Sequence, residues 1–280
     1  MPPSSVVPCL ANIRLHPIKS LDPVSVLEAR ISPSGGLEFD RAWALYSVDG
    51  KWVNGKRTAA IHLIRANYTA GLGMVTLSVP GDRREIPTRT FDFPNAYEDA
   101  AEWFSIFFEQ QIIVRYSENG FPDDTIASGP TIVSTPSLQT VCDWFPPTPQ
   151  GFRIELDEVR QRFRTTLEID ATVQGEKLPA FWEDRLFGDD ERSVVRFRIG
   201  EVQFEGSNPC ARCPVPSRNP RTGETIASFQ KYFAQQRQST LPEWSARGRF
   251  DHFYRLATNT RIAPSETGKL LRVGDPLRLS

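Results

Sequence analysis

The amino-acid sequence predicts a mainly β fold with a few helices, in the α+β class. Short runs rich in β-branched and aromatic residues recur along the chain, and Gly, Pro, Asp and Asn separate them. Only a few segments have the apolar spacing of a helix. With 280 residues, 39% of them hydrophobic, the chain is long enough to bury a sizeable core in one large β-rich domain or in two smaller ones.

The predicted strands follow one another from the N-terminal region into the last third of the chain. In each of them, residues that favour strands stand between residues that favour turns. The segments are Asn12–His16, Ser25–Ile31, Arg41–Val48, Met74–Val79, Ile112–Tyr116, Thr131–Ser134, Thr165–Ile169 and Val194–Ile199.

Three further segments have helical patterns. Asn95 can cap the first helix, because Glu98 lies three residues on and can return the hydrogen bond. The second begins at Thr135, as the cap, with Pro136 at the first helical position. The third spans Thr225–Gln236. The expected buried faces are Tyr97, Ala101, Phe104 and Phe108; Leu138, Val141, Cys142 and Phe145; and Ile226, Phe229, Tyr232 and Phe233. Cys142 is therefore expected in the core.

Two stretches interrupt these elements. Asp143–Arg153 contains three prolines, each of which removes a donor and restricts the residue before it, so we expect a surface connection. Ser117–Thr125 contains an Asn-Gly turn and a Pro-Asp-Asp segment. We place a domain boundary in this second stretch, with one domain at residues 9–120 and the other at residues 121–280.

Charge and composition narrow the class of partner. Thirty-three basic and 34 acidic residues give a formal net charge of −1, so no overall field would gather nucleic acid or an anionic membrane, and any basic site must be local. The N-terminus lacks the pattern of a signal peptide, and no apolar run approaches the roughly 18–20 residues of a membrane span. Four cysteines are too few for a disulfide scaffold. We therefore expect a cytoplasmic protein with no nucleic-acid partner and no membrane span.

The sharpest local feature is the pair Cys210 and Cys213 within Asn208–Pro214. A structural zinc site would need two more ligands, but the other cysteines are isolated and the chain has three histidines, all remote in sequence. A thioredoxin-like redox pair would need a helix starting at the first cysteine, and the prolines after the second cysteine oppose one. Two half-buried cysteines in a loop, without chemistry, are the remaining alternative.

Short motifs stand in a fixed order along the chain: His16–Ser20, Phe39–Trp43, Ile132–Leu138, Arg162–Arg164, Ile199–Val202, the double-cysteine segment and Val273–Leu277. Together they resemble the MOSC superfamily, and more closely the group that joins an N-terminal MOSC β-barrel region to a MOSC domain, as in the mitochondrial amidoxime-reducing component and its bacterial relatives. The resemblance covers nearly the whole chain. It implies a MOSC-type β-barrel with the N-terminal MOSC β-barrel region packed against it.

The resemblance also implies a molybdenum cofactor (Mo-molybdopterin), with Cys213 as the metal ligand and catalytic residue. In that family the second cysteine of the pair binds molybdenum. A pterin dithiolene supplies two sulfurs, and one soft thiolate completes a sulfur-rich set. Metal binding would keep Cys213 deprotonated, and the neighbouring Arg212 would favour the anion. Cys210 is expected to be structural.

The phosphate and pterin of such a cofactor require cations, hydroxyls and free backbone donors. The resemblance places Lys19 and Ser20 near the phosphate; the alternative is a surface lysine after a turn. Arg41 lies in an apolar predicted strand, where it needs a partner, so a buried ion pair is its alternative. Ser134 and Thr135 lie where a strand meets a helix N-terminus, which attracts anions, and simple helix capping is their alternative.

Three arginines alternate at positions 160, 162 and 164, so in an extended segment they would project to one side as a cationic strip; a solvated face is the alternative. The family pattern assigns Arg164 to cofactor binding and usually continues with Pro-Asn, whereas this chain has Thr165 and Thr166. Thr166 can donate one hydrogen bond but cannot reproduce the paired donor and acceptor of an amide. We keep Thr166 as a cofactor-binding residue without the role of that asparagine.

The resemblance implies a molybdenum-dependent oxidoreductase that reduces N-hydroxylated substrates, such as amidoximes and hydroxylamines. The cysteines cannot build the plant-type iron–sulfur module that some bacterial relatives carry, so we expect electrons from a separate donor protein of the cytochrome b5-like, flavin or ferredoxin type. The alternative is a molybdenum-cofactor carrier or sulfur-transfer protein that acts through a Cys213 persulfide. A zinc-stapled interaction module is disfavoured by its ligand count.

Overall fold

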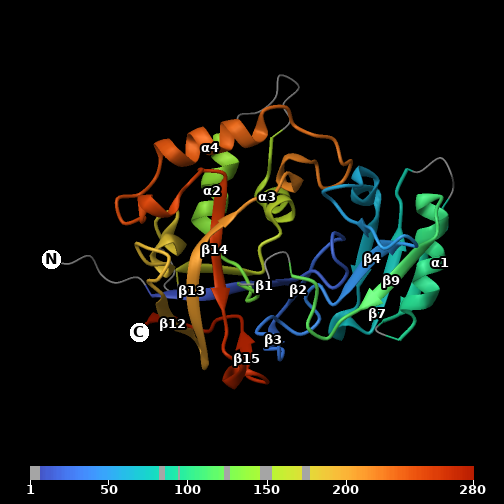
Figure 1. Ribbon diagram of the computed structural model, residues 1–280, viewed down its shortest axis with the longest axis horizontal. Helices are drawn as coiled ribbons and strands as arrows, with labels where there is room; N and C mark the ends of the chain where they lie inside the picture. Colours follow the sequence, from blue (N-terminus) through green and yellow to red (C-terminus); the bar gives the residue numbers. More distant parts are fainter. Residues whose placement is uncertain (1–6, 82–85, 94, 123–126, 146–152, 172–176) are drawn as a thin grey trace.

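The computed structural model describes residues 7–81, 86–93, 95–122, 127–145, 153–171 and 177–280. Strands dominate it, as predicted for a mainly β, α+β fold. Two bodies of strands lie side by side (Figure 1). Helices α2 (Thr135–Trp144), α3 (Leu156–Phe163) and α4 (Phe229–Ser239) lie above the first body, and α1 (Tyr97–Phe108) lies along the outer side of the second.

The first body is an eight-stranded sheet in the order β16-β12-β13-β14-β10-β11-β1-β2. Its strands are β1 (Pro8–Leu15), β2 (Val24–Val26), β10 (Ile132–Ser134), β11 (Leu167–Ala171), β12 (Val195–Ile199), β13 (Val202–Ala211), β14 (Arg255–Arg261) and β16 (Leu277–Leu279). The β10–β11 pair is parallel, and the other pairs are antiparallel. The core inside this sheet includes Ile132, Phe197 and Phe204, all without exposed surface.

Hydrogen bonds close this sheet into a barrel. The Leu10 N–H donates to the Asp275 carbonyl at 2.9 Å, and the Gly274 N–H donates to the Leu10 carbonyl at 2.7 Å. These bonds join β1 to the segment before β16, which is the other end of the strand order. Closure thus pairs the first half of β1 with the end of the sheet at β16, whereas β2 pairs with the second half of β1 and stays the last strand of the order. A two-stranded ribbon of β3 (Glu28–Arg30) and β15 (Leu270–Arg272) lies beside it.

The second body holds two three-stranded sheets. Their strands are β4 (Trp43–Ser47), β5 (Trp52–Val53) and β9 (Ile112–Tyr116), and β6 (Arg65–Tyr68), β7 (Met74–Ser78) and β8 (Arg89–Asp92). Helix α1 packs Trp103, Phe104 and Phe107 into their core, where Trp43 is also buried. The large aromatic side chains supply most of the apolar area that this small body can bury.

Short 3-10 helices fill the connections. They are η1 (Ala59–Leu63), η2 (Ala70–Leu72), η3 (Trp182–Leu186), η4 (Val215–Ser217), η5 (Arg247–Arg249) and η6 (Pro264–Glu266). Helix η3 contacts β10, β12, β13 and β14, so it packs against the barrel wall. Gly206 in β13 permits this contact, because a Cβ there would lie 1.6 Å from the Leu186 carbonyl oxygen.

Each predicted strand segment overlaps a strand of the structure. Two long strands, β13 and β14, were not predicted, although they form the centre of the large sheet. Arg41 was placed in a strand, and that prediction is wrong: β4 begins at Trp43, and Arg41 has a left-handed φ of 55° in the turn before it.

Strands β1 and β2 belong to the same sheet as β10–β14, so this sheet draws on both predicted domains. The boundary near residue 120 stays a prediction.

The helices differ in detail from the predictions. Helix α1 begins at Tyr97 with Ala96 as its cap, not Asn95, and its buried face is rotated by one residue to Ala100, Trp103, Phe104 and Phe107. The Trp103 indole N–H donates to the Pro87 carbonyl at 2.7 Å, which fixes that face inward. Helix α2 is capped by Ser134 rather than Thr135, and it buries Leu138, Val141 and Cys142 as predicted, with Phe145 partly buried.

The third predicted helix, Thr225–Gln236, starts later. Helix α4 begins at Phe229 after Ser228, whose left-handed φ of 59° ends the preceding turn. Phe229 and Phe233 are buried as predicted, whereas Tyr232 and Ile226 are partly buried. The predicted surface connection Asp143–Arg153 begins inside α2, and residues 146–152 of it lie outside the described residues.

Candidate functional site

The main cavity of the protein has a volume of about 450 Å³ and lies between the two bodies of strands. The loops after β1 and β5 and the turn before β4 line one side. The end of α3, the end of β13 and the middle of β14 line the other. This volume falls in the range of about 300–1,000 Å³ that small-molecule sites occupy.

The lining of this cavity is strongly cationic. Among the described residues that line it, the charged side chains are Lys19, Arg41, Lys56, Arg162, Arg164 and Arg212 against a single carboxylate, Asp40. The chain as a whole has a formal net charge of −1. The basic site is therefore local, and the concave surface concentrates its field on an anionic ligand.

Three described residues of the lining other than glycine have a left-handed backbone. Ser20 has a φ of 77°, Arg41 of 55° and Arg164 of 51°. Residues other than glycine rarely adopt this backbone conformation. Such strain persists only where the surrounding structure enforces it. All three were predicted as cofactor-binding residues, so strain and predicted function coincide at these positions.

Arg41 is held by an ion pair and by two contacts across the cavity wall. Its guanidinium donates to Asp40, to the Arg164 carbonyl at 3.2 Å and to Thr166 Oγ1 at 3.5 Å. Burial alone would raise the pKa of Asp40, but the Arg41 charge and the His16 imidazole and backbone N–H outweigh burial and lower it. The ion pair that was the alternative for Arg41 is therefore present, and it lies in the cavity lining.

Arg164 ends helix α3 as its cap and lines the cavity. Burial, followed by the charge of Arg164, lowers the pKa of His62 to about 4. The same two causes, in the same order, lower the pKa of His16 to about 3. Both imidazoles are therefore neutral near pH 7, and His62 adds no charge to the cavity that it lines.

The predicted cationic strip is wrong, because residues 156–163 form helix α3 rather than an extended segment. Arg160 turns away to pair with Glu168 at 2.7 Å. Arg162 is buried, pairs with Glu158 at 2.5 Å and donates to the Pro216 carbonyl at 3.0 Å. A helix separates residues that alternate by about 200° around its axis, so these arginines face different neighbours.

Lys19 and Ser20 hold two loops at the cavity rim. Lys19 Nζ donates to the Phe121 carbonyl at 2.7 Å and lies 5.2 Å from the centre of the Trp52 ring. Ser20 Oγ accepts a hydrogen bond from the Gly55 N–H at 3.1 Å. Both residues line the cavity, so their cation and hydroxyl stand where an anion would contact them.

The cysteine pair lies at the end of β13. Cys210 and Cys213 are both partly buried free thiols, and both line the cavity. The β13–β14 pairing shifts register between Pro209 and Ala211, which marks a bulge at Cys210. On β14, Ala257 has a φ of 74°. The irregular pairing frees this end of β13 from the regular ladder beside the cavity.

The Arg212 guanidinium contacts the sulfur of Cys210. Its Nη1 lies 3.0 Å from Cys210 Sγ, and its Nη2 donates to the Phe163 carbonyl. Among the described residues, no hydrogen bond joins Arg212 to Cys213, and no three His, Cys, Asp or Glu side chains lie close enough to hold a metal ion together. A metal at Cys213 would therefore need further ligands from outside the described protein groups.

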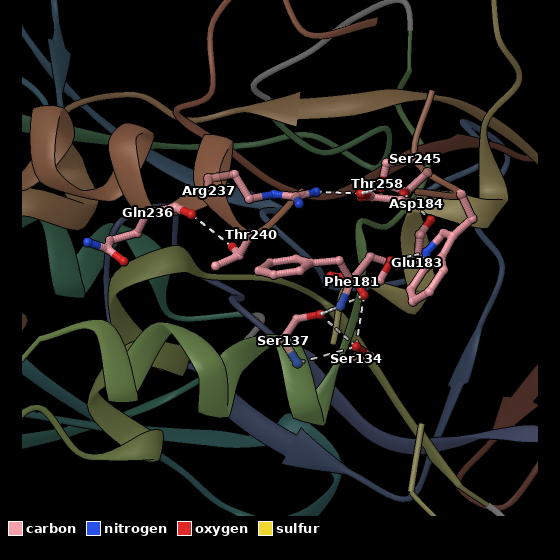
Figure 2. A network of polar contacts seen from close by, with 11 residues as sticks. Ser134, Ser137, Phe181, Glu183, Asp184, Gln236, Arg237, Thr240, Ser245 and Thr258 are labelled. Atoms are coloured by element: carbon pink, nitrogen blue, oxygen red, sulfur yellow. Dashed lines mark hydrogen bonds and ion pairs between the residues drawn. The ribbon is translucent and has the colours of Figure 1, made fainter. Parts of the chain in front are cut away.

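Ser134 and Thr135 do not line the cavity. Ser134 Oγ donates to Glu183 Oε2 at 2.8 Å and also lies 2.7 Å from Ser137 Oγ, as Figure 2 shows. Thr135 Oγ1 donates to Glu168 at 2.9 Å. The other predicted binding residues are brought together in the cavity lining: Lys19, Ser20, Arg41, Arg164, Thr166, Arg212 and Cys213. Their role as cofactor ligands stays a prediction.

Asp40, His62 and Asn259 also line the cavity, and none of the three was predicted as a site residue. One sequence feature could have indicated a site role for Asp40: it directly precedes Arg41, a residue that needs a partner of opposite charge. Asn259 had a weaker one, as an amide inside a segment of buried residues. The place of His62 in the cavity lining depends on contacts between residues far apart in sequence, so no local sequence pattern indicates it.

Two family models match this chain. Residues 7–111 match the MOSC N-terminal beta barrel domain, and residues 153–278 match the MOSC domain. The chain belongs to the MOSC superfamily. The cavity of this MOSC protein is lined from both matched regions, with Lys19, Ser20 and Arg41 from the first and Arg164 and Cys213 from the second.

This MOSC protein is also similar to curated proteins named molybdenum cofactor sulfurase. The protein of Drosophila grimshawi is 24% identical, over 96% of this chain and 34% of its own length. That of Drosophila ananassae is 24% identical, over 78% of this chain and 29% of its own length. The chain thus spans about a third of the length of these relatives. Within the described residues, no helix is both long and apolar enough to cross a bilayer.

Proposed function

We propose that this MOSC protein binds a molybdenum-pterin cofactor in its main cavity, with Cys213 as the metal ligand, and reduces N-hydroxylated substrates such as amidoximes and hydroxylamines. One observation carries the proposal. A thiol that can serve as a soft metal ligand, Cys213, shares a cavity with six cationic side chains and, among the described residues, a single carboxylate. That combination suits a ligand with an anionic end and a metal centre.

The residues present fit such a cofactor. An isolated thiol can hold a metal only if the ligand brings most of the other donors, and a pterin dithiolene brings two sulfurs. The cationic side chains and the Ser20 hydroxyl suit a phosphate, since guanidinium and ammonium groups bind phosphate oxygens through charge-assisted hydrogen bonds. When bound, the cofactor supplies two-electron redox chemistry at the metal.

The protein's own groups prepare the cavity for that ligand. Asp40 and the Arg164 carbonyl fix the Arg41 guanidinium before any ligand arrives, so little ordering is needed on binding. Arg212 holds the Cys210 sulfur, and among the described residues no arginine donates a hydrogen bond to Cys213. His62 stays neutral near pH 7 and adds no charge to the cavity.

The reaction needs a substrate and an electron source from outside the chain. We propose a separate donor protein of the cytochrome b5-like, flavin or ferredoxin type, because the described residues contain no cysteine cluster that could hold an iron–sulfur centre. The proposed substrates are small molecules that carry an amidoxime or hydroxylamine group.

Metal and pterin analysis tests the binding step. The protein is produced in a molybdopterin-competent host, and molybdenum, zinc and pterin are quantified per chain. We expect molybdenum and pterin near one per chain in the wild type. In the control Cys9→Ala, which removes a partly buried thiol on β1 outside the cavity, we expect the same content. Zinc in place of molybdenum would contradict the proposal.

Turnover then tests the reaction. Loaded protein is given benzamidoxime and a chemical electron donor, and benzamidine is quantified. Formation of benzamidine supports the reductase. Full molybdenum content without turnover of benzamidoxime or a hydroxylamine would favour the second candidate, a cofactor carrier or sulfur-transfer protein that uses a Cys213 persulfide. The name of the Drosophila relatives supports this candidate, and a persulfide on Cys213 would be detected by mass spectrometry.

A further inference from the structure

Asn259 stands in the middle of β14, on the cavity wall opposite Asn208 of β13. It is 6% exposed, so its carboxamide is removed from bulk water. Its backbone is fixed by the strand pairing and by the Ser207 hydroxyl, which donates to the Asn259 carbonyl at 3.1 Å. The position of this side chain is therefore set by the barrel wall and not by a loop.

The two neighbours of Asn259 face the other way. Thr258 Oγ1 donates to the Glu183 carbonyl at 2.7 Å, and Thr260 Oγ1 donates to the Pro130 carbonyl at 2.7 Å. Because successive side chains of a strand point to opposite faces, Asn259 faces the cavity that it lines. Both threonines are thus satisfied within the protein.

The Asn259 carboxamide has no such partner. Among the described residues, no hydrogen bond reaches its side-chain oxygen or nitrogen, whereas the Asn208 amide accepts from Ser207 Oγ at 2.9 Å and donates to the Pro209 carbonyl at 3.3 Å. The buried side-chain atoms that are sealed from solvent without a partner do not include those of Asn259. Its amide therefore reaches the cavity surface, where a ligand can meet it.

We propose that the Asn259 carboxamide binds the ligand of this cavity, by pairing with a planar, uncharged edge that places an N–H donor beside an acceptor. An amide offers one acceptor oxygen and two N–H donors in one plane, so it matches such an edge with two hydrogen bonds. A buried polar group costs free energy unless it is paired, so an occupant that pairs it is favoured over one that does not.

Two sources carry this chemistry: the pterin ring of the cofactor and the amidoxime group of a substrate. The inference rests on the proposed function for the presence of these ligands in the cavity, but it assigns a role to a residue that the proposed function does not use. The cationic side chains would bind the anionic end of the ligand, and Asn259 would recognise its neutral, planar part.

The test uses two variants of the full chain, each with a matched control. Asn259→Leu keeps the approximate size of the side chain and removes both hydrogen bonds. Asn259→Asp keeps the acceptor and removes the donors. Asn67→Leu and Asn67→Asp make the same changes at an exposed position of β6. Molybdenum and pterin per chain are measured, and the dissociation constant of benzamidoxime is measured on loaded protein by calorimetry.

If the pterin is the partner, both Asn259 variants lose molybdenum and pterin about three- to tenfold, and the Asn67 variants do not. If the substrate is the partner, loading is unchanged and benzamidoxime binds about three- to tenfold more weakly in both Asn259 variants. Loading and affinity within twofold of the wild type in both variants would overturn the proposal. Wild-type protein that takes up neither ligand would overturn the proposed function and this inference together.

A measurement on the wild type covers the case in which a variant does not fold. The side-chain amide resonances of Asn259 are compared by ¹⁵N NMR in cofactor-free protein, in loaded protein and after addition of benzamidoxime. A shift of both N–H resonances on loading or on benzamidoxime addition supports the proposal and identifies the source. Resonances that stay unchanged in both steps would overturn it.

Discussion

Asp40 is the single carboxylate among the described residues that line the cavity, and its neighbours hold it in the charged form. It accepts from Arg41 and, at 2.8 Å, from the His16 backbone N–H. Arg41 is itself mostly buried, with 18% of its side chain exposed. The charge of Asp40 therefore compensates the Arg41 cation beside it.

Asp40→Asn tests this compensation. At pH 7 we expect the variant to be less stable by about 1–3 kcal/mol, because Arg41 loses its ion pair. The pKa of Asp40 is lower in the folded protein than its ordinary value of 3.8, so the stabilisation is present above that pH and is lost as pH falls through the folded pKa. Urea unfolding at pH 7 and at lower pH values measures this, with Asp92→Asn, at an exposed position, as the control.

At the scale of single residues, local sequence patterns predicted which residues line the cavity better than they predicted the partners of each side chain. Arg41 and Arg164 were expected to bind the cofactor, and both line the cavity. Ser134 was expected there too, but its hydroxyl lies against Glu183, which is 49 residues away in sequence. The capping of α2 by Ser134 is a local property and was foreseeable as an alternative, whereas its buried acidic partner depends on the folding of η3.

Helix η3 is fixed to the rest of the protein by a buried polar network (Figure 2). Glu183 accepts from Ser134 and Ser137 at 2.8 Å each, and Asp184 accepts from Arg237 of α4 at 2.5 Å and from Ser245. Burial, followed by the nearby charge of Asp184, raises the pKa of Glu183 to about 7. The element therefore depends on a carboxyl group that titrates near neutral pH.

Glu183→Gln tests the titration of that group. A pKa raised from 4.5 to about 7 means that the folded state binds the proton more tightly, so the stabilisation is present below pH 4.5 and is lost as pH rises to about 7. We expect wild type to lose on the order of 1–3 kcal/mol relative to the variant between pH 4.5 and pH 8. Thermal unfolding across this range measures the difference. A difference that is constant with pH would contradict the assignment.

Gly206→Ala tests the close contact between η3 and β13. The new Cβ would lie 1.6 Å from the Leu186 carbonyl oxygen, and this oxygen cannot move without displacing η3. We expect a loss of about 3 kcal/mol or more in unfolding free energy. Gly248→Ala is the control, because nothing lies within 4 Å of the added Cβ there, and it should change stability by less than about 0.5 kcal/mol.

At the scale of elements, runs of strand-favouring residues between turn residues predicted the regular strands, but they did not predict the irregular strands β13 and β14. Strand β13 contains Gly206 and Pro209, which argue against a strand, and both are tolerated for tertiary reasons: one permits the contact with η3, and the other adjoins a register shift. Strand β14 carries a Thr-Asn-Thr segment that reads as polar. Its two threonine hydroxyls are satisfied by distant carbonyls, which no local window contains.

At the scale of the whole molecule, the cavity needs both bodies of strands. Lys19 and Arg41 precede the second body, whereas Arg164 and Cys213 belong to the barrel side. The resemblance predicted most of these residues, but sequence could not predict that their charges converge, because each contributes from a different turn or element end. Anion binding should therefore stabilise the molecule as a whole.

Inorganic phosphate provides a probe of that convergence. We expect millimolar phosphate to raise the Tm of cofactor-free wild-type protein above its value at equal ionic strength in chloride, because binding to the folded state alone shifts the unfolding equilibrium. Arg164→Gln should lose most of this increase, and Arg192→Gln, at an exposed position outside the cavity, should keep it. An equal increase in both variants would indicate a nonspecific salt effect.

The most direct test of the central claim compares the two cysteines of the cavity. Cys213→Ala and Cys210→Ala are produced with the wild type in a molybdopterin-competent host, and molybdenum per chain is measured in all three. The account predicts that Cys213→Ala loses the metal while Cys210→Ala, whose sulfur contacts Arg212 at 3.0 Å, retains most of it. Loss of molybdenum in Cys210→Ala with retention in Cys213→Ala, or retention in both, would contradict it.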